Sequence, residues 1–211
     1  MSDSRHNHYK MSDLKDIAAV ILAAGRSSRM GAFKPLMPMG HETVIEHVIG
    51  LFRTAGITDI VVVLGHEADR LNPFLKEHGV RLVINPDHDR GMFSSVQAGV
   101  GRLGDDCRAF FLMPADMPLV RPETLKITLD AFHESGMDVC RPCYRGKRGH
   151  PPLISAKLIT PILTFTESGG MRALLARHQK TSIAVACDDP GILIDLNTPE
   201  DFKNATGREN T

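Results

Sequence analysis

The sequence predicts an α/β protein, a doubly wound three-layer sandwich built on a mainly parallel sheet. Three observations lead to this prediction. Short apolar runs typical of strands recur along the 211 residues, amphipathic stretches with helical spacing separate them, and no internal repeat or low-complexity linker divides the chain. Alternation of this kind requires crossover connections, which place helices on both faces of a parallel sheet. The predicted strands are residues 17–22, 60–64, 80–84, 109–113, 139–143, 182–186 and 192–194.

The predicted helices follow from the apolar residues between these runs. Pro122-Glu123 is a good first turn for one of them. Near the end of the sequence, Thr198 is a candidate N-cap, Pro199 is the first helical residue, and Asp201 can complete a capping box. Three helix faces are defined by Val44, Val48, Leu51 and Phe52, by Val96, Val100 and Leu103, and by Leu125, Leu129 and Phe132.

These elements fit one domain, residues 16–205, with a polar tail at residues 1–15 that we expect to be disordered. Residues 144–153 are a polar, Gly-rich excursion set into that domain. The tail lacks the apolar core of a signal peptide, and no apolar run approaches the ~20 residues that cross a bilayer. We therefore expect a cytoplasmic protein without a membrane partner.

The charge balance argues against a nucleic-acid partner. Lys and Arg together number 25, as do Asp and Glu, so the formal net charge is zero. Nucleic-acid-binding surfaces normally show a basic excess. Net charge therefore does not indicate the function, and local sequence motifs must be used instead.

The four cysteines include one C-x-x-C pair, Cys140 and Cys143, with a spacing that occurs in zinc and redox sites. No second pair completes a set of four zinc ligands. The pair also falls in a predicted strand and turn, whereas a thioredoxin-type motif opens a helix. We interpret the cysteines as reduced structural thiols.

The most informative segment follows the first predicted strand. Gly25 begins a loop of small residues that also carries Arg26, Arg29 and Lys34. Small residues let backbone N–H groups approach a ligand, and clustered cations suit a polyphosphate. The five residues between Gly25 and Gly31 exclude a P-loop, and the dinucleotide pattern G-x-G-x-x-G is absent. The loop therefore predicts nucleotide chemistry, with a Gly-rich turn bearing solvated cations as the alternative.

Asp116 follows the apolar strand at residues 109–113, between Pro114 and Pro118. The strand delivers this carboxylate to the same sheet edge as the Gly25 loop, and the prolines restrain the turn. Mg²⁺ prefers one or two carboxylates together with substrate phosphates. Asp116 is therefore a candidate metal ligand, and an Asx-turn aspartate is the alternative.

A predicted helix start provides another candidate site. Gly91 permits an unusual backbone angle, and the free N–H groups of residues 93–95 can meet an anion or a base edge. Ser94 and Ser95 are thus candidate nucleotide-binding residues. The alternative is a serine N-cap with nothing bound.

Two cationic segments are candidates for gripping a second, anionic substrate. Residues 145–152 carry Arg145 and His150, and could reach over the active edge or form a solvated hairpin tip. His150 could contact phosphate or stabilise the turn. Arg172 belongs to a Gly-rich helix start. The histidines without metal spacing, His41, His47 and His88, are expected at the surface, and Met30, Met92 and Met117 are candidates to line the pocket.

These segments together resemble one family, the MobA-like nucleotidyltransferases, which include the molybdenum cofactor cytidylyl- and guanylyltransferases. The pattern L-A-A-G-x-S-x-R-M-G-x-x-K, from Leu22 to Lys34, is similar to the family signature. Asp116 begins a D-M-P match, and residues 195–201 resemble the closing motif D-x-D-T-P-E-D, with Asn197 where many relatives carry Asp. The resemblance covers about residues 17–203 and implies a Rossmann-like nucleotidyltransferase fold.

The resemblance implies transfer of a nucleoside monophosphate from an NTP to a phosphate-bearing acceptor, with Mg²⁺ as cofactor and release of pyrophosphate. The implied catalytic residues are Arg29, Lys34 and Asp116; the nucleotide-binding residues are Leu22, Ala23, Ala24, Gly25, Ser94 and Ser95; the acceptor-binding residues are Arg145, His150 and Arg172; and the metal ligands are Asp116 with Asp195 or Asn197.

The residue at position 24 bears on the choice of nucleotide. Guanylyl relatives typically carry a second Gly in place of Ala24, so the sequence is closer to the cytidylyl branch. We therefore expect CTP as donor and molybdopterin as acceptor, with a molybdoenzyme receiving the product. The alternatives are a guanylyl- or sugar-phosphate nucleotidyltransferase, or a maturation chaperone that binds the cofactor without turnover.

Overall fold

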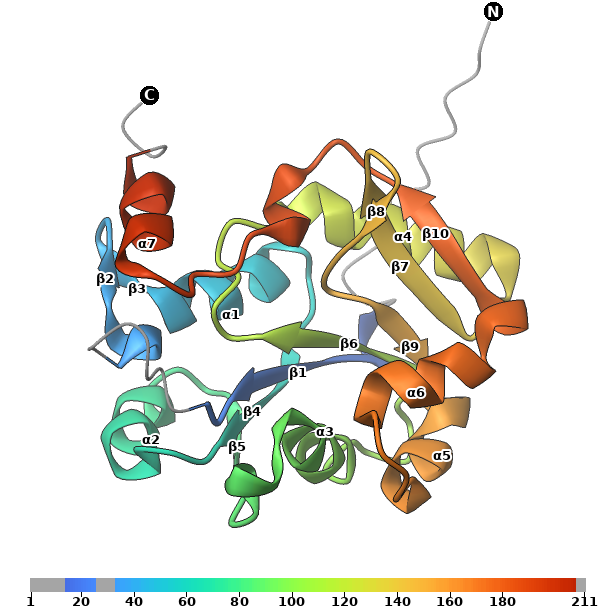
Figure 1. The fold of residues 1–211 in the computed structure, drawn as a ribbon, viewed down its shortest axis with the longest axis horizontal. Coiled ribbons are helices and arrows are strands. Elements are labelled where there is room, and N and C mark those ends of the chain that lie inside the picture. The colour runs from blue at the N-terminus through green and yellow to red at the C-terminus, as the bar shows by residue number, and fades with distance from the viewer. Residues whose placement is uncertain (1–13, 26–32, 208–211) are drawn as a thin grey trace, which may run out of the picture.

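The structure, a computed structural model that describes residues 14–25 and 33–207, confirms the predicted fold class. Its main sheet has the strand order β10-β7-β9-β6-β1-β4-β5, and β8 pairs with β7 (Figure 1). The strands of this sheet are β1 (Ile17–Ala23), β4 (Asp59–Leu64), β5 (Arg81–Ile84), β6 (Ala109–Pro114), β7 (Val139–Tyr144), β8 (Lys147–Arg148), β9 (Leu153–Ser155) and β10 (Ser182–Ala186); β2 (Pro38–Met39) and β3 (Glu42–Thr43) form a separate pair. The helices are α1 (Val44–Thr54), α2 (Ala68–Lys76), α3 (Met92–Val100), α4 (Pro122–Ser135), α5 (Ile159–Thr164), α6 (Gly170–Arg177) and α7 (Pro199–Thr206).

β1 lies inside the sheet because its seven residues are all apolar and can be buried on both faces. It pairs in parallel with β4 on one side and with β6 on the other. Its side chains alternate between two cores, so that Ile21 joins one cluster and Val20 the other. The apolar run therefore fixes the strand that leads into the Gly25 loop.

Helices cover both faces of the sheet, as in a doubly wound fold. The apolar faces of α1, α2 and α4 contribute to the core on one side, and those of α3, α5 and α6 to the core on the other. In Figure 1, α3, α5 and α6 lie together below the sheet, while α1 and α4 lie above it. Helices are thus present at each of the three predicted amphipathic stretches.

One local prediction is wrong, and one strand was not predicted. Residues 192–194 do not form a strand: Pro190–Leu193 is a 3₁₀ turn, started by Pro190 and capped by the Asp189 carboxylate, which accepts from the Gly191 N–H at 2.9 Å. The excursion at residues 144–153 leads into an additional strand, β9, which runs antiparallel to both β6 and β7. With three residues following Pro151-Pro152, β9 is too short to show a recognisable alternation.

The topology brings several loops to one edge of the sheet. β1, β6 and β7 all run in the same direction, because β1 pairs in parallel with β6, and β9 is antiparallel to both β6 and β7. The loops that follow these strands therefore emerge at one edge, where open α/β sheets bind ligands. Within the described residues, no helix is both long and apolar enough to cross a membrane.

Candidate active site

A cavity of about 310 Å³ opens where β1 and β6 end. Ala23 and Ala24 form part of its wall and are only 4% and 6% exposed. Among the described residues, none has an atom within 4 Å of a Cβ atom added at Gly25. The cavity is lined by Leu22, Ala23, Ala24, Gly25, Lys34, Pro35, His88, Met92, Ser95, Pro114, Ala115 and Asp116.

Lys34 reaches into a cluster of oxygen atoms beside this cavity. Its Nζ donates to Asp116 Oδ2 at 3.1 Å and to Asn197 Oδ1 at 2.9 Å. The lysine side chain is 11% exposed and that of Asp116 is 27% exposed, so solvent screens the ion pair only in part. Three segments far apart in the sequence therefore meet at one point.

Backbone hydrogen bonds hold this meeting point together. The Ala115 N–H donates to the Leu22 carbonyl at 3.0 Å, which fixes the turn after β6 against the end of β1. The Leu196 N–H donates to the Asp116 carbonyl at 2.8 Å, which fixes the closing segment against the same turn. The position of Asp116 is thus set by the main chain on both sides.

The closing segment is anchored at both of its ends. At its start, buried Asp189 accepts from the Arg121 N–H at 2.9 Å and from Thr124 Oγ1 at 2.7 Å, both at the start of α4. At its end, Thr198 and Asp201 form the predicted capping box of α7. Hydrogen bonds from the Thr198 side chain and backbone hold the pKa of Asp201 below its usual value.

Asp195 and Asn197 lie between these anchors. Asp195 is exposed, and its carboxylate accepts from the Asn197 side-chain amide. That contact leaves the Asn197 amide oxygen facing Lys34. Asp195 and Asn197 therefore differ: of these two residues, Asn197 has a described hydrogen bond to Lys34, and Asp195 has one to Asn197.

The oxygen atoms of this cluster suit a hard divalent cation. Asp116 and Asp195 supply carboxylates and Asn197 an amide oxygen, the donor types that Mg²⁺ accepts alongside phosphate and water. The Lys34 ammonium already bonds to two of these oxygens, so their lone pairs converge on a positive charge. Within the described part of the chain, no three His, Cys, Asp or Glu side chains gather as a metal site. A metal held here would therefore need ligands from its substrate or from water.

The two candidate serines point in different directions. Ser95 is 3% exposed, lines the cavity and accepts from Asn85 Nδ2 at 3.0 Å. Ser94 does not line this cavity, and its hydroxyl donates to the Asp87 and Gly91 carbonyls. Ser94 therefore shapes the turn before α3 and faces a neighbouring groove.

Sequence reasoning missed His88 and Asn85. His88 was predicted at the surface, yet it lines the cavity and packs beside Ala24 and Gly65. Asn85 is 3% exposed and orients both serines. The polar Asn85-Pro86 step directly after β5 was the signal available for this residue. Of the candidate methionines, Met92 lines the cavity and Met117 is buried in the core.

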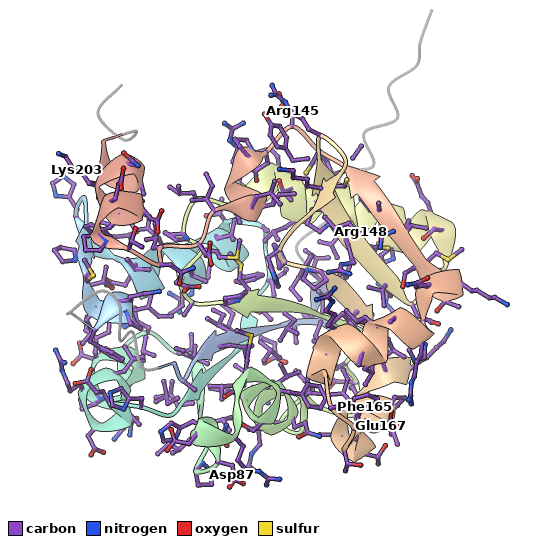
Figure 2. The ribbon with its side chains drawn as sticks, in the orientation of Figure 1. Asp87, Arg145, Arg148, Phe165, Glu167 and Lys203 are labelled. Carbon is purple, nitrogen blue, oxygen red and sulfur yellow. The ribbon has the colours of Figure 1, made fainter. Side chains whose placement is uncertain are left out.

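The predicted acceptor residues divide into two groups. His150 and Arg172 line a second cavity, of about 370 Å³. Arg145 does not line it; the residue projects outward at the tip of the β7–β8 hairpin, and its guanidinium lies 5.1 Å from the Tyr144 ring centroid (Figure 2). Burial lowers the pKa of His150, which favours its neutral form.

The remaining candidates are Arg29 and the two cysteines of the C-x-x-C pair. Arg29 lies outside the described residues. Cys140 and Cys143 both lie on β7 and are free thiols. Burial raises the pKa of Cys140, so this thiol is poorly disposed to ionise.

Comparison with known proteins identifies relatives across most of the chain. The family described as "MobA-like NTP transferase domain" matches residues 19–181. The molybdenum cofactor cytidylyltransferase of Escherichia coli (strain K12) is 27% identical over 198 residues, which cover 91% of this chain and 96% of the relative.

Solved structures with the same fold include two proteins of similar length. A nucleotidyl transferase from Methanothermobacter thermautotroptrophicus superposes with a TM-score of 0.77 at 27% identity, covering 91% of this chain and 96% of its own. Rv0371c from Mycobacterium tuberculosis H37Rv superposes with a TM-score of 0.76 at 26% identity, covering 90% and 97% respectively. Rv0371c has also been solved in complex with manganese.

Proposed function

This chain belongs to the MobA-like NTP transferase family and is a nucleotidyltransferase; from that premise we propose that it transfers CMP from CTP to the phosphate of molybdopterin. The observation that carries the proposal is the contact of Lys34 with Asp116 and Asn197 at the mouth of a cavity walled by residues 22–25. A cation and two oxygen-rich segments at one point suit a metal-bound triphosphate. The reaction would take place in the cytoplasm, where thiols such as Cys143 stay reduced.

The chemistry is a displacement at phosphorus. An oxygen of the acceptor phosphate attacks the α-phosphorus of the nucleotide, the bond to the β-phosphate oxygen breaks, and pyrophosphate leaves. The reaction gathers several negative charges, so charge neutralisation and positioning should supply most of the rate enhancement. No side-chain base is required, because a phosphomonoester is already ionised near neutral pH.

The proposed roles of the residues follow from their places around the cavity. Lys34 exchanges its contacts with Asp116 and Asn197 for phosphate oxygens, and Arg29 assists it. The main chain of residues 22–25 receives the base and ribose, and Ser95 also lines this cavity. Asp116, with Asp195 or Asn197, would hold Mg²⁺, which when bound neutralises phosphate charge and orients the reacting groups.

The choice of CTP is supported by the size of the cavity and by one methyl group. A volume of about 310 Å³ is at the small end of the roughly 300–1,000 Å³ typical of ligand pockets, which favours the smaller pyrimidine base. The Ala24 methyl group is part of the wall that limits this volume. The choice of molybdopterin is supported by the likeness to the cytidylyltransferase of E. coli.

The direct test is pyrophosphate release with each Mg–NTP and molybdopterin. We expect release with CTP to exceed release with GTP, UTP and ATP, and to require both the metal and the acceptor. Absence of release with CTP would overturn the proposal. Detection of the CMP-linked product by mass spectrometry identifies the acceptor.

A matched pair of variants separates the enzyme from a cofactor-binding chaperone. Asp116→Ala should abolish turnover, because it removes a carboxylate at the proposed reaction centre. Asp105→Ala removes an exposed carboxylate in the turn after α3 and should leave turnover unchanged. Molybdopterin binding without NTP or metal, together with no turnover in the unmodified protein, would favour a chaperone.

A further inference from the structure

A second cavity lies beside the first on the same face of the sheet. Leu112 of β6 lines the second cavity and Pro114 of the same strand lines the first. α3 borders the first cavity and α6 the second, and both helices pack into the same core cluster. The two cavities are therefore neighbours along β6.

Three guanidinium groups line the second cavity. Arg141 comes from β7, Arg148 from β8 and Arg172 from α6. None of the three takes part in an ion pair within the described residues. No Asp or Glu lines the cavity. Arg148 and Arg172 are exposed, so water screens their charges, whereas Arg141 is half-buried and gains more from a bound anion.

Arg141 is the least exposed of the three arginines and is the strongest indication of a bound anion. Its Nε is buried and has no hydrogen-bond partner in the described part of the chain. Burial lowers the pKa of Arg141, and Arg148 lowers it further. His150 Nδ1 is likewise buried without a partner beside the same cavity. Buried polar groups in native proteins are normally satisfied by protein or water, so these two atoms are open to a polar ligand that enters the cavity.

We propose that this cavity binds an anionic group of the acceptor other than the reacting phosphate, with Arg141, Arg148 and Arg172 as its cationic wall. This rests on the proposed function, which places the reacting phosphate beside Asp116. β9 lies between β6 and β7. At about 4.8 Å per strand, the backbone of Arg141 therefore lies roughly 10 Å from the strand that leads to Asp116. A single phosphate beside Asp116 does not also fill the second cavity, so the proposal requires an acceptor with two anionic groups.

The rest of the cavity wall indicates what carries the second group. Leu112, Met171 and Leu175 line the cavity together with the arginines. Guanidinium planes stack on flat groups, and aliphatic side chains pack against them. The ligand is accordingly an anion attached to an apolar or planar scaffold.

Methionine methyl NMR can follow the two cavities separately, because Met92 lines the first and Met171 the second. The whole chain, labelled with ¹³C-methyl methionine, is first saturated with Mg²⁺ and α,β-methylene-CTP, and phenyl phosphate is then added. We expect phenyl phosphate to shift Met171 while Met92 stays in its nucleotide-bound position. Phenol, the same ring without the charge, should leave Met171 unmoved.

Two charge-removing variants complete the test. Arg141→Gln should weaken phenyl phosphate binding at Met171 at least fivefold. Arg102→Gln, which removes an exposed arginine after α3, should leave it unchanged. An unmoved Met171 in the unmodified protein, equal binding in Arg141→Gln, or an equal response to phenol would each overturn the proposal.

A failure of the CTP analogue to bind tests the proposed function and not the anion site. If the CTP analogue leaves Met92 unmoved, the proposed function fails, while the anion site is still judged from Met171. If phenyl phosphate displaces the CTP analogue, the second cavity belongs to the nucleotide site, and the inference is wrong.

Discussion

Lys34 is nearly buried, yet its ammonium ends among oxygen atoms at the mouth of the cavity. Burial of a lysine is favourable only when its charge is compensated, and Asp116 and Asn197 provide that compensation. Because Asp116 is partly exposed, the contact can open without leaving a carboxylate trapped in the core. Lys34 is thus held ready in the place where phosphate oxygens would arrive.

The substitution Lys34→Met tests this role. We expect turnover to fall by about 10²–10³-fold, the usual loss when one preorganised charge that stabilises a transition state is removed. Lys126→Met, a change of the same charge on the exposed face of α4, should leave turnover unchanged. Thermal unfolding of both variants checks that the loss is not one of folding. If turnover of Lys34→Met stays within threefold of that of the unmodified protein, Lys34 does not take part in the mechanism.

The substitution Ala24→Gly tests the choice of base. Removal of one methyl group from the wall should raise kcat/KM for GTP relative to CTP by about tenfold or less, because a methyl group is worth ~1 kcal/mol. Ala184→Gly, the same change on the edge strand β10, should leave the ratio unchanged. Steady-state kinetics with both nucleotides measure it. A ratio that stays constant in Ala24→Gly would show that the base is selected elsewhere.

At the scale of elements, the closing segment is positioned by its neighbours rather than by regular structure of its own. A 3₁₀ turn, one backbone bond to Asp116 and the cap of α7 together place Asn197 against Lys34. Asp201 accepts from the N–H groups of both Asn197 and Thr198, at 3.1 and 2.8 Å. The helix cap therefore also orients a residue of the proposed site.

Thr198→Ala should disturb both the helix and the site. Loss of one cap in a domain of this size is expected to lower the Tm by about 2–4 °C. Because the folded-state pKa of Asp201 lies below its ordinary 3.8, the stability from its hydrogen bonds is present above that pH and is lost as the pH falls through the lowered value. The Tm difference between Thr198→Ala and the unmodified protein should thus shrink below about pH 4. Thr198→Ser, which keeps the hydroxyl, should restore both the Tm and turnover.

The closing segment also shows what a sequence alone can predict at this scale. The capping box at residues 198–201 is a local pattern of hydrogen-bonding groups, so it is readable from the sequence and present in the structure. The predicted strand at 192–194 is wrong: only Ile192 is fully buried, where it packs closely against Gly149, while Leu193 is partly exposed. Apolarity indicates burial, but it does not choose between a strand and a turn.

At the scale of the whole molecule, the sequence predicted the layers and the shared edge because both follow from alternation and strand direction. The sequence could not predict that His150 lines the second cavity while Arg145 does not, because the path of the β7–β8 hairpin depends on contacts with other parts of the chain. It also gave no reason to single out Arg141, which lies within the C-x-x-C stretch. Only the strand order, with β9 inserted between β6 and β7, brings that arginine to the second cavity.

The union of distant segments at one edge has a thermodynamic consequence for the whole fold. A ligand that contacts β1, β6 and the closing segment binds only when all three are assembled, so it stabilises the folded state by mass action. At 100 times its Kd, Mg–CTP would add about 2.7 kcal/mol, which in a domain of this size raises the Tm by about 5–10 °C. Mg–GTP at the same concentration should raise it less. The variant Asp116→Asn should reduce the Mg²⁺-dependent part of the CTP shift, because it removes a carboxylate charge while keeping the shape of the side chain. Equal Tm shifts for all four NTPs would contradict selection of the base by this protein. An undiminished Mg²⁺-dependent shift in Asp116→Asn would show that Asp116 is not a metal ligand.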